Sequence, residues 1–456
     1  MPRLLAALLI TLLPSASMAA TLALTDDPEF GCLVTLDGPI APGDTETFLS
    51  LIKQASTSSR HADLIWYTEY DDGTPPDIDL KVPLNLCLNS PGGALTEAMK
   101  LTDAVHGRLG TMVRPGARCE SACALVFMAG SYDTGSDIGY ITSRHLHVDG
   151  KLGFHAPSLS VPEGSYDAAS VARAYQVSVA ATAKIFRNLV NYRFAPSLAA
   201  RMHETPPEQM FYVSTVREAA RWGISVVGVD APSAISDAVI RTACGNLYRR
   251  TRDQLNSDPD SWSRNGHNGA QVDRPERETF TYTNFGMEAL GTCEGRFLDP
   301  GDEYNLARTW WPVSSVVQNA TWATAAFPDA QPTLFFSFLQ SFMAWPGEVP
   351  LAALPRNGQA IEMTQPGNCF VYDSSDRLID REPCTRIQRA EPDGRLVSLH
   401  DWPSGARTVI ELEGGIRRIN GGEAYAWYWP EPKPQGAGET CTQNTSSGNS
   451  FCFHLD

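Results

Sequence analysis

Short apolar runs alternate with amphipathic stretches over roughly the first half of the chain. The runs have the length of strands and the stretches have helical spacing, with Leu95, Met99, Thr102 and Val105 on one face of the first long one. The predicted strands are 32–36, 82–88, 111–113 and 152–155. The predicted helices are 94–105, 122–129, 171–190 and 216–222. Strands that alternate with helices form mostly parallel sheets covered by helices, so residues 20–235 are predicted to be an α/β domain.

The amino-acid composition changes after this domain. Residues 253–277 are rich in Asp, Asn, Ser, Gly and Pro and are predicted to be a linker or a long surface loop. Residues 306–345 are aromatic and apolar, which is typical of a small helical or mixed core, although an exposed hydrophobic binding patch would have the same composition. We therefore assign 236–360 to a linker and an aromatic-rich middle region.

The last stretch, 361–456, carries an all-β signal. Short β-prone runs at 369–372, 408–412 and 416–419 are separated by clusters of turn residues. Two pairs of cysteines close in sequence, at 369 and 384 and at 441 and 452, would staple a small module. The region is predicted to be a small, disulfide-rich all-β module.

The N-terminus has the features of a secretory signal peptide over residues 1–19. Arg3 precedes a short apolar run, and Ser17-Met18-Ala19 resembles a cleavage site with small residues. The apolar run is too short to cross a bilayer, although an uncleaved membrane anchor is the alternative. We expect a periplasmic or secreted protein without an integral membrane segment after cleavage.

Ten cysteines are expected to form disulfides, because the count is even and an exported protein meets an oxidising environment. No Cys-x-x-Cys pair or zinc-like histidine spacing occurs, so no metal and no cofactor are expected. The formal net charge of −16 argues against a nucleic-acid partner. The cysteines are Cys32, Cys87, Cys119, Cys123, Cys244, Cys293, Cys369, Cys384, Cys441 and Cys452.

Three segments of the first domain carry candidate chemistry. Gly92 and Gly93 lie between a strand and a helix, where free backbone N–H groups can hold an oxyanion or a phosphate, although a simple turn has the same pattern. Ser121 opens an apolar helix, where it could be a helix cap or a nucleophile. His155 follows a strand, where it could be a base or a structural histidine.

Together, the strand–Asn-Ser-Pro-Gly-Gly–helix, Cys-x-Ser-Ala-Cys and strand–His-x-Pro segments resemble the proteolytic subunit of Clp protease and the crotonase-like superfamily. The resemblance runs from about residue 30 to residue 230 and includes the closing helix near 214–224. It implies a Clp/crotonase-like fold with Ser121 as the nucleophile and His155 as the general base. It also implies Ala122, and Gly92 or Gly93, as oxyanion-hole donors.

The chain departs from this pattern at the third member of the triad. The family's acid should lie about a dozen residues before Gly223, and the nearest carboxylates there are Glu208 and then Glu204. The acid is therefore displaced to Glu208 or missing, and a Ser–His dyad retains some activity. A Ser–Lys pair is another route, for which lysines 100, 151 and 184 are available.

The cysteines on either side of Ser121 resemble a group of exported Clp-like proteins. A Cys119–Cys123 disulfide beside the serine is expected, with a nucleophilic thiol as the alternative. The resemblance also makes a Cys32–Cys87 pair plausible, because these residues would lie on neighbouring strands of the fold.

These features favour an exported serine hydrolase, a peptidase that works without ATP on a peptide or protein substrate, with a homo-oligomer as its candidate assembly. The alternative is a non-catalytic binding or scaffolding protein of the cell envelope that retains the fold. An acyl-CoA enzyme comes third, because that cofactor is cytosolic.

Overall fold

The computed structural model describes residues 20–455 with several gaps. The gaps are 28, 58–83, 134–139, 158–163, 193, 231, 234–235, 252–270, 274–278, 286–290, 298–315, 323–332, 340, 431–433 and 435–439. The predicted signal peptide and most of the predicted linker at 253–277 therefore lie outside the described residues. The domain boundaries stay predictions.

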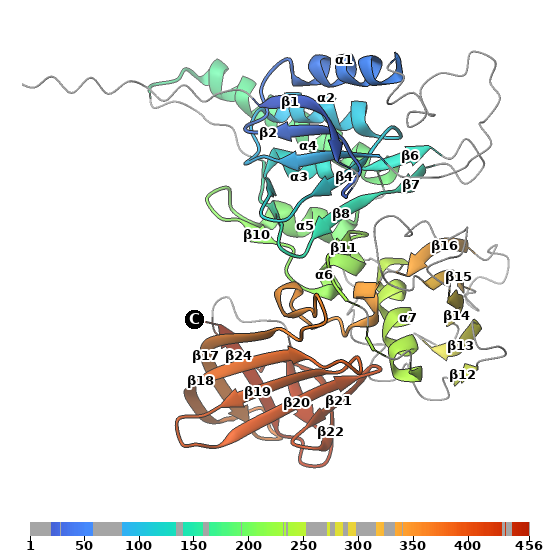
Figure 1. The fold of residues 1–456 in the computed structure, drawn as a ribbon. Helices are drawn as coiled ribbons and strands as arrows, with labels where there is room; N and C mark the ends of the chain where they lie inside the picture. The colour runs from blue at the N-terminus through green and yellow to red at the C-terminus, as the bar shows by residue number, and fades with distance from the viewer. Residues whose placement is uncertain are drawn as a thin grey trace, which may run out of the picture.

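A six-stranded mixed sheet forms the centre of the first part (Figure 1). Its first strand is antiparallel to its neighbour, and the remaining pairs are parallel, which confirms the predicted mostly parallel sheet. In sheet order the strands are β1 (Thr21–Asp27), β2 (Cys32–Asp37), β3 (Asn85–Asn89), β4 (Gly110–Val113), β8 (Arg144–His147) and β11 (Ser225–Val227). β4 is buried along its whole length, as expected for a strand covered on both faces.

Helices surround this sheet and bury their apolar sides in one core. Phe48 and Ile52 of the first helix and Met99 and Val105 of the second belong to the same hydrophobic cluster as the strands. The helices are α1 (Asp44–Thr57), α2 (Leu95–Val105), α3 (Ala122–Phe127), α4 (Ala168–Asn191), α5 (Pro196–Glu204) and α6 (Val216–Arg221). The predicted helical spacing of α2 is confirmed, because Met99, Thr102 and Val105 are all buried.

Two smaller sheets accompany the large one. The three-stranded sheet, in the order β10-β9-β5, consists of β5 (Arg118–Glu120), β9 (Lys151–Phe154) and β10 (Phe211–Tyr212). The two-stranded sheet consists of β6 (Ser131–Asp133) and β7 (Tyr140–Thr142). The strand predicted at 152–155 thus belongs to a separate sheet, whose strand ends carry the candidate chemistry.

The middle of the chain is a five-stranded antiparallel sheet beside helix α7 (Asp237–Thr251), which agrees with the mixed alternative of the expected helical or mixed region. The strands are β12 (Gln271–Asp273), β13 (Thr279–Phe285), β14 (Gly291–Phe297), β15 (Val316–Trp322) and β16 (Thr333–Leu339). β12 also shows that the end of the predicted linker is part of this sheet. Phe342 and Trp345 are fully buried, so the core prediction is confirmed for these two aromatics of the 306–345 stretch. The remaining aromatic side chains of that stretch lie outside the described residues.

The two short 3-10 helices that follow, η3 (Ser341–Ala344) and η4 (Leu351–Ala353), bring the chain back to the first part. The N–H of Val216 donates to the carbonyl of Val349 at 3.0 Å. The N–H of Leu351 donates to the carbonyl of Ser214 at 2.8 Å. Residues assigned by sequence to the middle region therefore complete the surroundings of α6.

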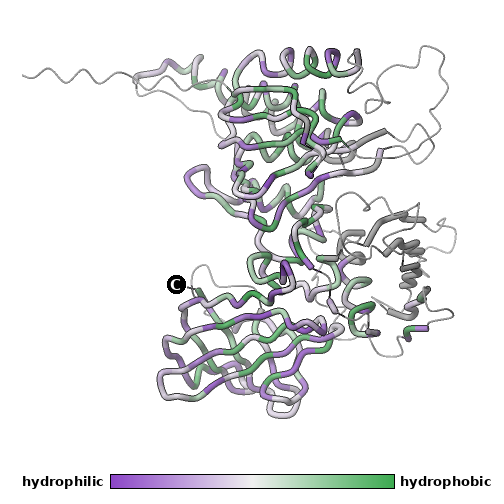
Figure 2. Tube along the Cα trace, viewed as in Figure 1, coloured by the Kyte–Doolittle hydropathy of each residue, from purple (hydrophilic) through white to green (hydrophobic). Residues whose placement is uncertain are grey.

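The C-terminal part is a closed eight-stranded antiparallel barrel, in which the last strand pairs with the first. Its strands are β17 (Glu362–Tyr372), β18 (Leu378–Ala390), β19 (Leu396–Asp401), β20 (Arg407–Glu413), β21 (Ile416–Ile419), β22 (Gly422–Tyr428), β23 (Thr440–Asn444) and β24 (Ser450–Leu455). Figure 2 shows polar and apolar residues alternating along several of these strands, the pattern of strands with one wet and one buried face. The all-β prediction is confirmed.

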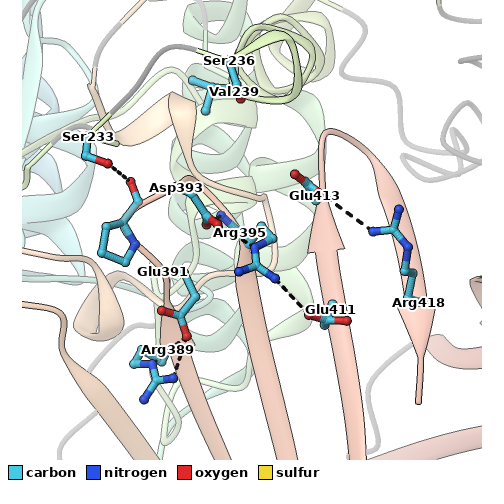
Figure 3. A network of polar contacts seen from close by, with 11 residues as sticks. Ser233, Ser236, Val239, Arg389, Glu391, Asp393, Arg395, Glu411, Glu413 and Arg418 are labelled. Atoms are coloured by element: carbon cyan, nitrogen blue, oxygen red, sulfur yellow. Dashed lines mark hydrogen bonds and ion pairs between the residues drawn. The ribbon is translucent and has the colours of Figure 1, made fainter. Parts of the chain in front are cut away.

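The barrel contacts α7 at the end formed by its hairpin turns. Ser233 donates its hydroxyl to the carbonyl of Pro392, and a ladder of ion pairs runs along the outer face of nearby strands (Figure 3). Arg395 joins Asp393 at 2.8 Å and Glu411 at 3.1 Å. Such surface pairs each contribute little to the stability of the barrel.

Candidate active site

Ser121 occupies a strained turn between β5 and α3. Its φ is 56° and its ψ is −124°, and its side chain makes no capping hydrogen bond to the helix. A non-glycine residue at positive φ is uncommon and costs free energy, so it persists only where the surroundings hold it. A helix-capping serine accepts a hydrogen bond from a backbone N–H of the helix. Ser121 accepts none, so the alternative of an ordinary helix cap is not supported.

The Asn-Ser-Pro-Gly-Gly loop lies directly against this turn. Ser90 forms a parallel bridge with Cys119 of β5, and a Cβ on Gly92 would lie only 2.8 Å from the Cβ of Ser121 and 3.1 Å from the N of Ala122. Only glycine permits this approach, because Gly92 also has a φ of 99°. The sequence segments around Gly92 and Ser121 are thus brought together.

The backbone N–H groups around Ser121 differ in whether they already have a hydrogen-bond acceptor. The N–H of Gly92 donates to the hydroxyl of Ser90 at 3.1 Å. In the described part of the chain, the N–H groups of Gly93 and Ala122 have no acceptor. Gly93 and Ala122 are therefore the pair of donors that remains open for a substrate oxygen.

A disulfide between Cys119 and Cys123 spans the Ser121 turn, with a Cα–Cα distance of 5.2 Å. Both cysteines are fully buried. The predicted bridge is present, and it leaves neither sulfur as a free thiol nucleophile. It ties the end of β5 to the first turn of α3, so the backbone on both sides of Ser121 is fixed.

His155 lies at the same edge of the small sheet as Ser121. β5 and β9 are parallel neighbours with Glu120 opposite Gly153, and the N–H of Ser121 donates to the carbonyl of Gly153 at 3.0 Å. The two residues therefore directly follow the carboxyl ends of adjacent strands. Ser121 and His155 make no hydrogen bond to each other in this structure; such bonds are often long before a substrate binds.

The ring of His155 has a defined partner on one side. Its Nδ1 lies 2.8 Å from the carbonyl oxygen of Ala156. Because a carbonyl oxygen can only accept, Nδ1 carries the hydrogen and Nε2 of the neutral ring presents a lone pair. This is the tautomer that a general base requires.

The segment that contains Glu208 passes His155, but Glu208 makes no hydrogen bond with it. Phe154 pairs with Phe211, and the N–H of Ala156 donates to Thr205, so the segment that contains Glu208 runs past His155. Glu208 itself is exposed, and the hydrogen-bond partner of Nδ1 is a backbone carbonyl. Its role as the triad acid stays a prediction.

A neighbouring contact was missed by sequence reasoning. Tyr212 of β10 donates its hydroxyl to Glu120 at 2.9 Å, across β9 between them. A Cβ on Gly153 would lie 2.9 Å from the ring of Tyr212, so the glycine makes room for this crossing. Burial raises the pKa of Tyr212, and the bond to Glu120 adds to that effect. The signal in the sequence was a glycine inside a strand.

The lysines considered for a Ser–Lys pair have other positions. Lys100 pairs with Glu97 at 3.1 Å. Lys151 lies opposite Arg118 at the start of β9, three residues or roughly 10 Å along the strands from Ser121. The side chain of Lys184 lies outside the described residues. Within the described part of the chain, no group of three or more His, Cys, Asp or Glu residues is arranged to hold a metal ion.

The other disulfides agree with the predicted pairs where both partners are described. Cys32 joins Cys87, Cys369 joins Cys384, and Cys441 joins Cys452. Cys244 is also disulfide-bonded. Several disulfides fit an extracellular or periplasmic environment. Among the described residues, no helix is both long and apolar enough to span a membrane.

Comparisons with known proteins give a similarity at the level of structure only. No protein-family model and no curated protein matches the chain. The chain is similar to a solved structure of a ClpP1 mutant from Listeria monocytogenes, with 13% identity and a TM-score of 0.28, over 42% of this chain and 89% of that one. A TM-score this low carries no argument about chemistry, which rests on the geometry of the site.

Proposed function

We propose that this chain is an exported serine hydrolase, a peptidase that works without ATP and uses Ser121 and His155. The observation that carries the proposal is the state of Ser121. Its backbone is strained, its hydroxyl caps nothing, and Gly92 packs against it. Strain of this kind is concentrated at active sites, where the surrounding structure holds a side chain in a reactive position.

The proposed reaction begins with attack of the Ser121 hydroxyl oxygen on a carbonyl carbon. Nε2 of His155 takes the hydroxyl proton and later gives it to the leaving amine. The N–H groups of Gly93 and Ala122 bind the oxyanion of the tetrahedral intermediate. The carbonyl of Ala156 keeps the ring in the required tautomer, and Glu208 is the carboxylate proposed to stabilise the imidazolium.

The disulfides support export, because such bonds persist in oxidising compartments. An exported enzyme has no supply of ATP, so a processive machine fed by an unfoldase does not fit. A limited peptidase with its own barrel and middle region fits better. Its substrate class is a peptide or a protein segment that reaches the edge of the small sheet.

A non-catalytic envelope protein is the second candidate. It is favoured by the absence of a carboxylate on the described partners of His155, and by exposed apolar side chains on α4, including Val171, Tyr175 and Phe186. Apolar side chains grouped on an exposed helix are typical of a surface that contacts another chain.

Labelling with a fluorophosphonate probe separates the two candidates, because the probe reacts only with an activated serine. We expect the wild type to be labelled, and the Ser121→Ala and His155→Gln variants to lose the label. Ser236→Ala is the matched control, since Ser236 also precedes a helix but accepts a hydrogen bond from the N–H of Val239. Wild-type protein that stays unlabelled, or a Ser121→Ala variant labelled as well as wild type, would rule out the hydrolase.

The same assay tests Glu208. If its carboxylate completes a triad, Glu208→Gln lowers the labelling rate by a factor approaching that of His155→Gln. If the carbonyl of Ala156 suffices, the rate stays within about tenfold of the wild type. The neighbouring exposed carboxylate Glu204 provides the control as Glu204→Gln.

A further inference from the structure

A pocket lies where the barrel, α7 and the segment before η4 meet. Its volume is about 50 Å³, and its walls include Arg241 and Thr242 of α7, Glu348, and Arg417 and Tyr425 of the barrel. Asn246 of α7 fixes one wall, because its side-chain amide donates to the carbonyls of Met343 and Trp345. The pocket is thus built by three parts of the chain that are distant in sequence.

Two arginines share one carboxylate at this pocket. Arg417 donates to Thr442 at 2.9 Å and to Glu348 at 3.2 Å, and its side chain is only 14% exposed. Arg217 of α6 forms an ion pair with the same carboxylate oxygen of Glu348. Glu348 therefore links Arg417 of the pocket wall to Arg217 of α6.

Arg241 is the second cation of the pocket wall. No carboxylate of the described residues lies within ion-pair distance of it. The turn at Gly414 brings the barrel close to it, since a Cβ there would lie 2.9 Å from the Cα of Ala238 and 3.1 Å from Nε of Arg241. Arg241, Glu348 and Arg417 are the charged residues of the pocket wall, which leaves one positive charge in excess.

We propose that this pocket binds a small free oxyanion between Arg241 and Arg417. Its volume holds roughly three or four water-sized groups, which suits a single tetrahedral anion such as phosphate or sulfate. Guanidinium groups match such anions because they donate paired hydrogen bonds, and Thr242 on the wall adds a hydroxyl.

Glu348 makes this proposal distinguishable from a merely structural ion-pair cluster. Its carboxylate competes with the anion for Arg417, so its removal has opposite consequences in the two cases. If the arginines serve only as a tether between α6 and the barrel, Glu348→Gln gains no affinity for anions. If the pocket is an anion site, the variant binds the anion more tightly than the wild type.

The test is the binding of inorganic phosphate to the full chain, measured by isothermal titration calorimetry at fixed ionic strength. We expect one phosphate per chain for the wild type, and binding weakened about tenfold or more in Arg241→Gln and Arg417→Gln, the loss expected for a hydrogen bond to a charged group. Glu348→Gln should bind about tenfold more tightly. Acetate, which is planar and carries two oxygens, should bind less tightly than phosphate.

Arg407→Gln is the matched control, because Arg407 is a barrel arginine that pairs with Asp401 instead of lining the pocket. Arg417→Lys keeps the charge, and it replaces Arg417→Gln if that variant does not fold. Absence of phosphate binding to the wild type would overturn the proposal. So would equal binding by the wild type and the Arg241→Gln variant. The readout is independent of catalysis, so a failed labelling experiment at Ser121 leaves this result unaffected.

Discussion

The disulfides that join neighbouring strands close loops of different length in the α/β part and in the barrel. Cys32 and Cys87 lie on the adjacent parallel strands β2 and β3 and are 55 residues apart in sequence. The two barrel bridges join antiparallel neighbours only 15 and 11 residues apart. Parallel neighbours need a crossover between them, so a bridge there closes a long loop. In a hairpin the loop is already short, and the bridge removes less entropy from the unfolded chain.

One glycine from each region shows a second difference, in backbone crowding. Gly93 in the α/β part approaches another strand end so closely that a Cβ would lie 2.2 Å from the carbonyl oxygen of Ile40. Gly405 in a barrel turn also has a positive φ, but a Cβ there would have no atom within 4 Å. Gly93 is therefore required for space, whereas Gly405 is required for backbone conformation alone.

The largest expected effect comes from removing a disulfide in each region. Replacing Cys32 and Cys87 by alanine should lower the free energy of unfolding by about 4 kcal/mol, and replacing Cys441 and Cys452 by about 3 kcal/mol, from the loop lengths of the two bridges. Urea denaturation of the full chain measures both. Equal losses, or a larger loss in the barrel, would contradict the comparison.

Alanine at the two glycines should give the next largest difference. Gly93→Ala is expected to lower the free energy of unfolding by about 3 kcal/mol or more, because backbone atoms must move to admit the Cβ. Gly405→Ala should cost about 1 kcal/mol, the penalty of a left-handed backbone alone. Thermal unfolding of the two variants provides the measurement, and similar melting temperatures would remove the distinction.

The smallest of the three effects concerns acid. Burial, with the nearby charge of Arg386, lowers the pKa of His400 inside the barrel to about 3. The unfolded chain binds a proton on this histidine below pH 6.5 and the folded chain does not, so its contribution to stability is complete above pH 6.5 and is lost as the pH falls toward 3. Between pH 7.5 and 4.5 this amounts to about 2 to 3 kcal/mol.

A His400→Phe variant should therefore lose less stability over that pH range than the wild type. His145 in β8, whose burial lowers its pKa to about 4, supplies the same comparison in the α/β part as His145→Phe. The midpoints of urea unfolding at pH 7.5 and 4.5 measure how much stability the wild type and each variant lose between these pH values. A variant with the same pH dependence as the wild type would show that the histidine is not neutral in the folded chain.

Residues that directly follow strands could be placed from sequence. His155 comes after the buried run of β9, and Ser121 comes before the apolar run of α3, so each could be placed by its local pattern. The glycine pair at 92 and 93 was placed for the same reason. Their meeting at one edge depends on β5, a short strand that the sequence did not predict. The positions themselves depend only on local patterns and on the rule that such strands are parallel neighbours.

Contacts between distant segments could not be placed in this way. The crossing of Tyr212 to Glu120 depends on the pairing of β10 with β9, and these strands are separated by two helices in the chain. Closure of the barrel depends on β17 meeting β24, which periodicity along either strand does not specify. The middle region could be predicted only as helical or mixed, because aromatic runs suit either helices or strands.

The hydrogen bonds that join α6 to the segment before η4 have a consequence for synthesis. The N–H groups of Val216 and Arg217 find their acceptors at Val349 and Gly347, about 130 residues later. At typical rates of translation this later segment follows roughly ten seconds after the first. Throughout that interval the newly made helix start lacks its acceptors. The α/β part can therefore reach its final form only once the middle of the chain has left the ribosome, and an assisting chaperone would meet it incomplete.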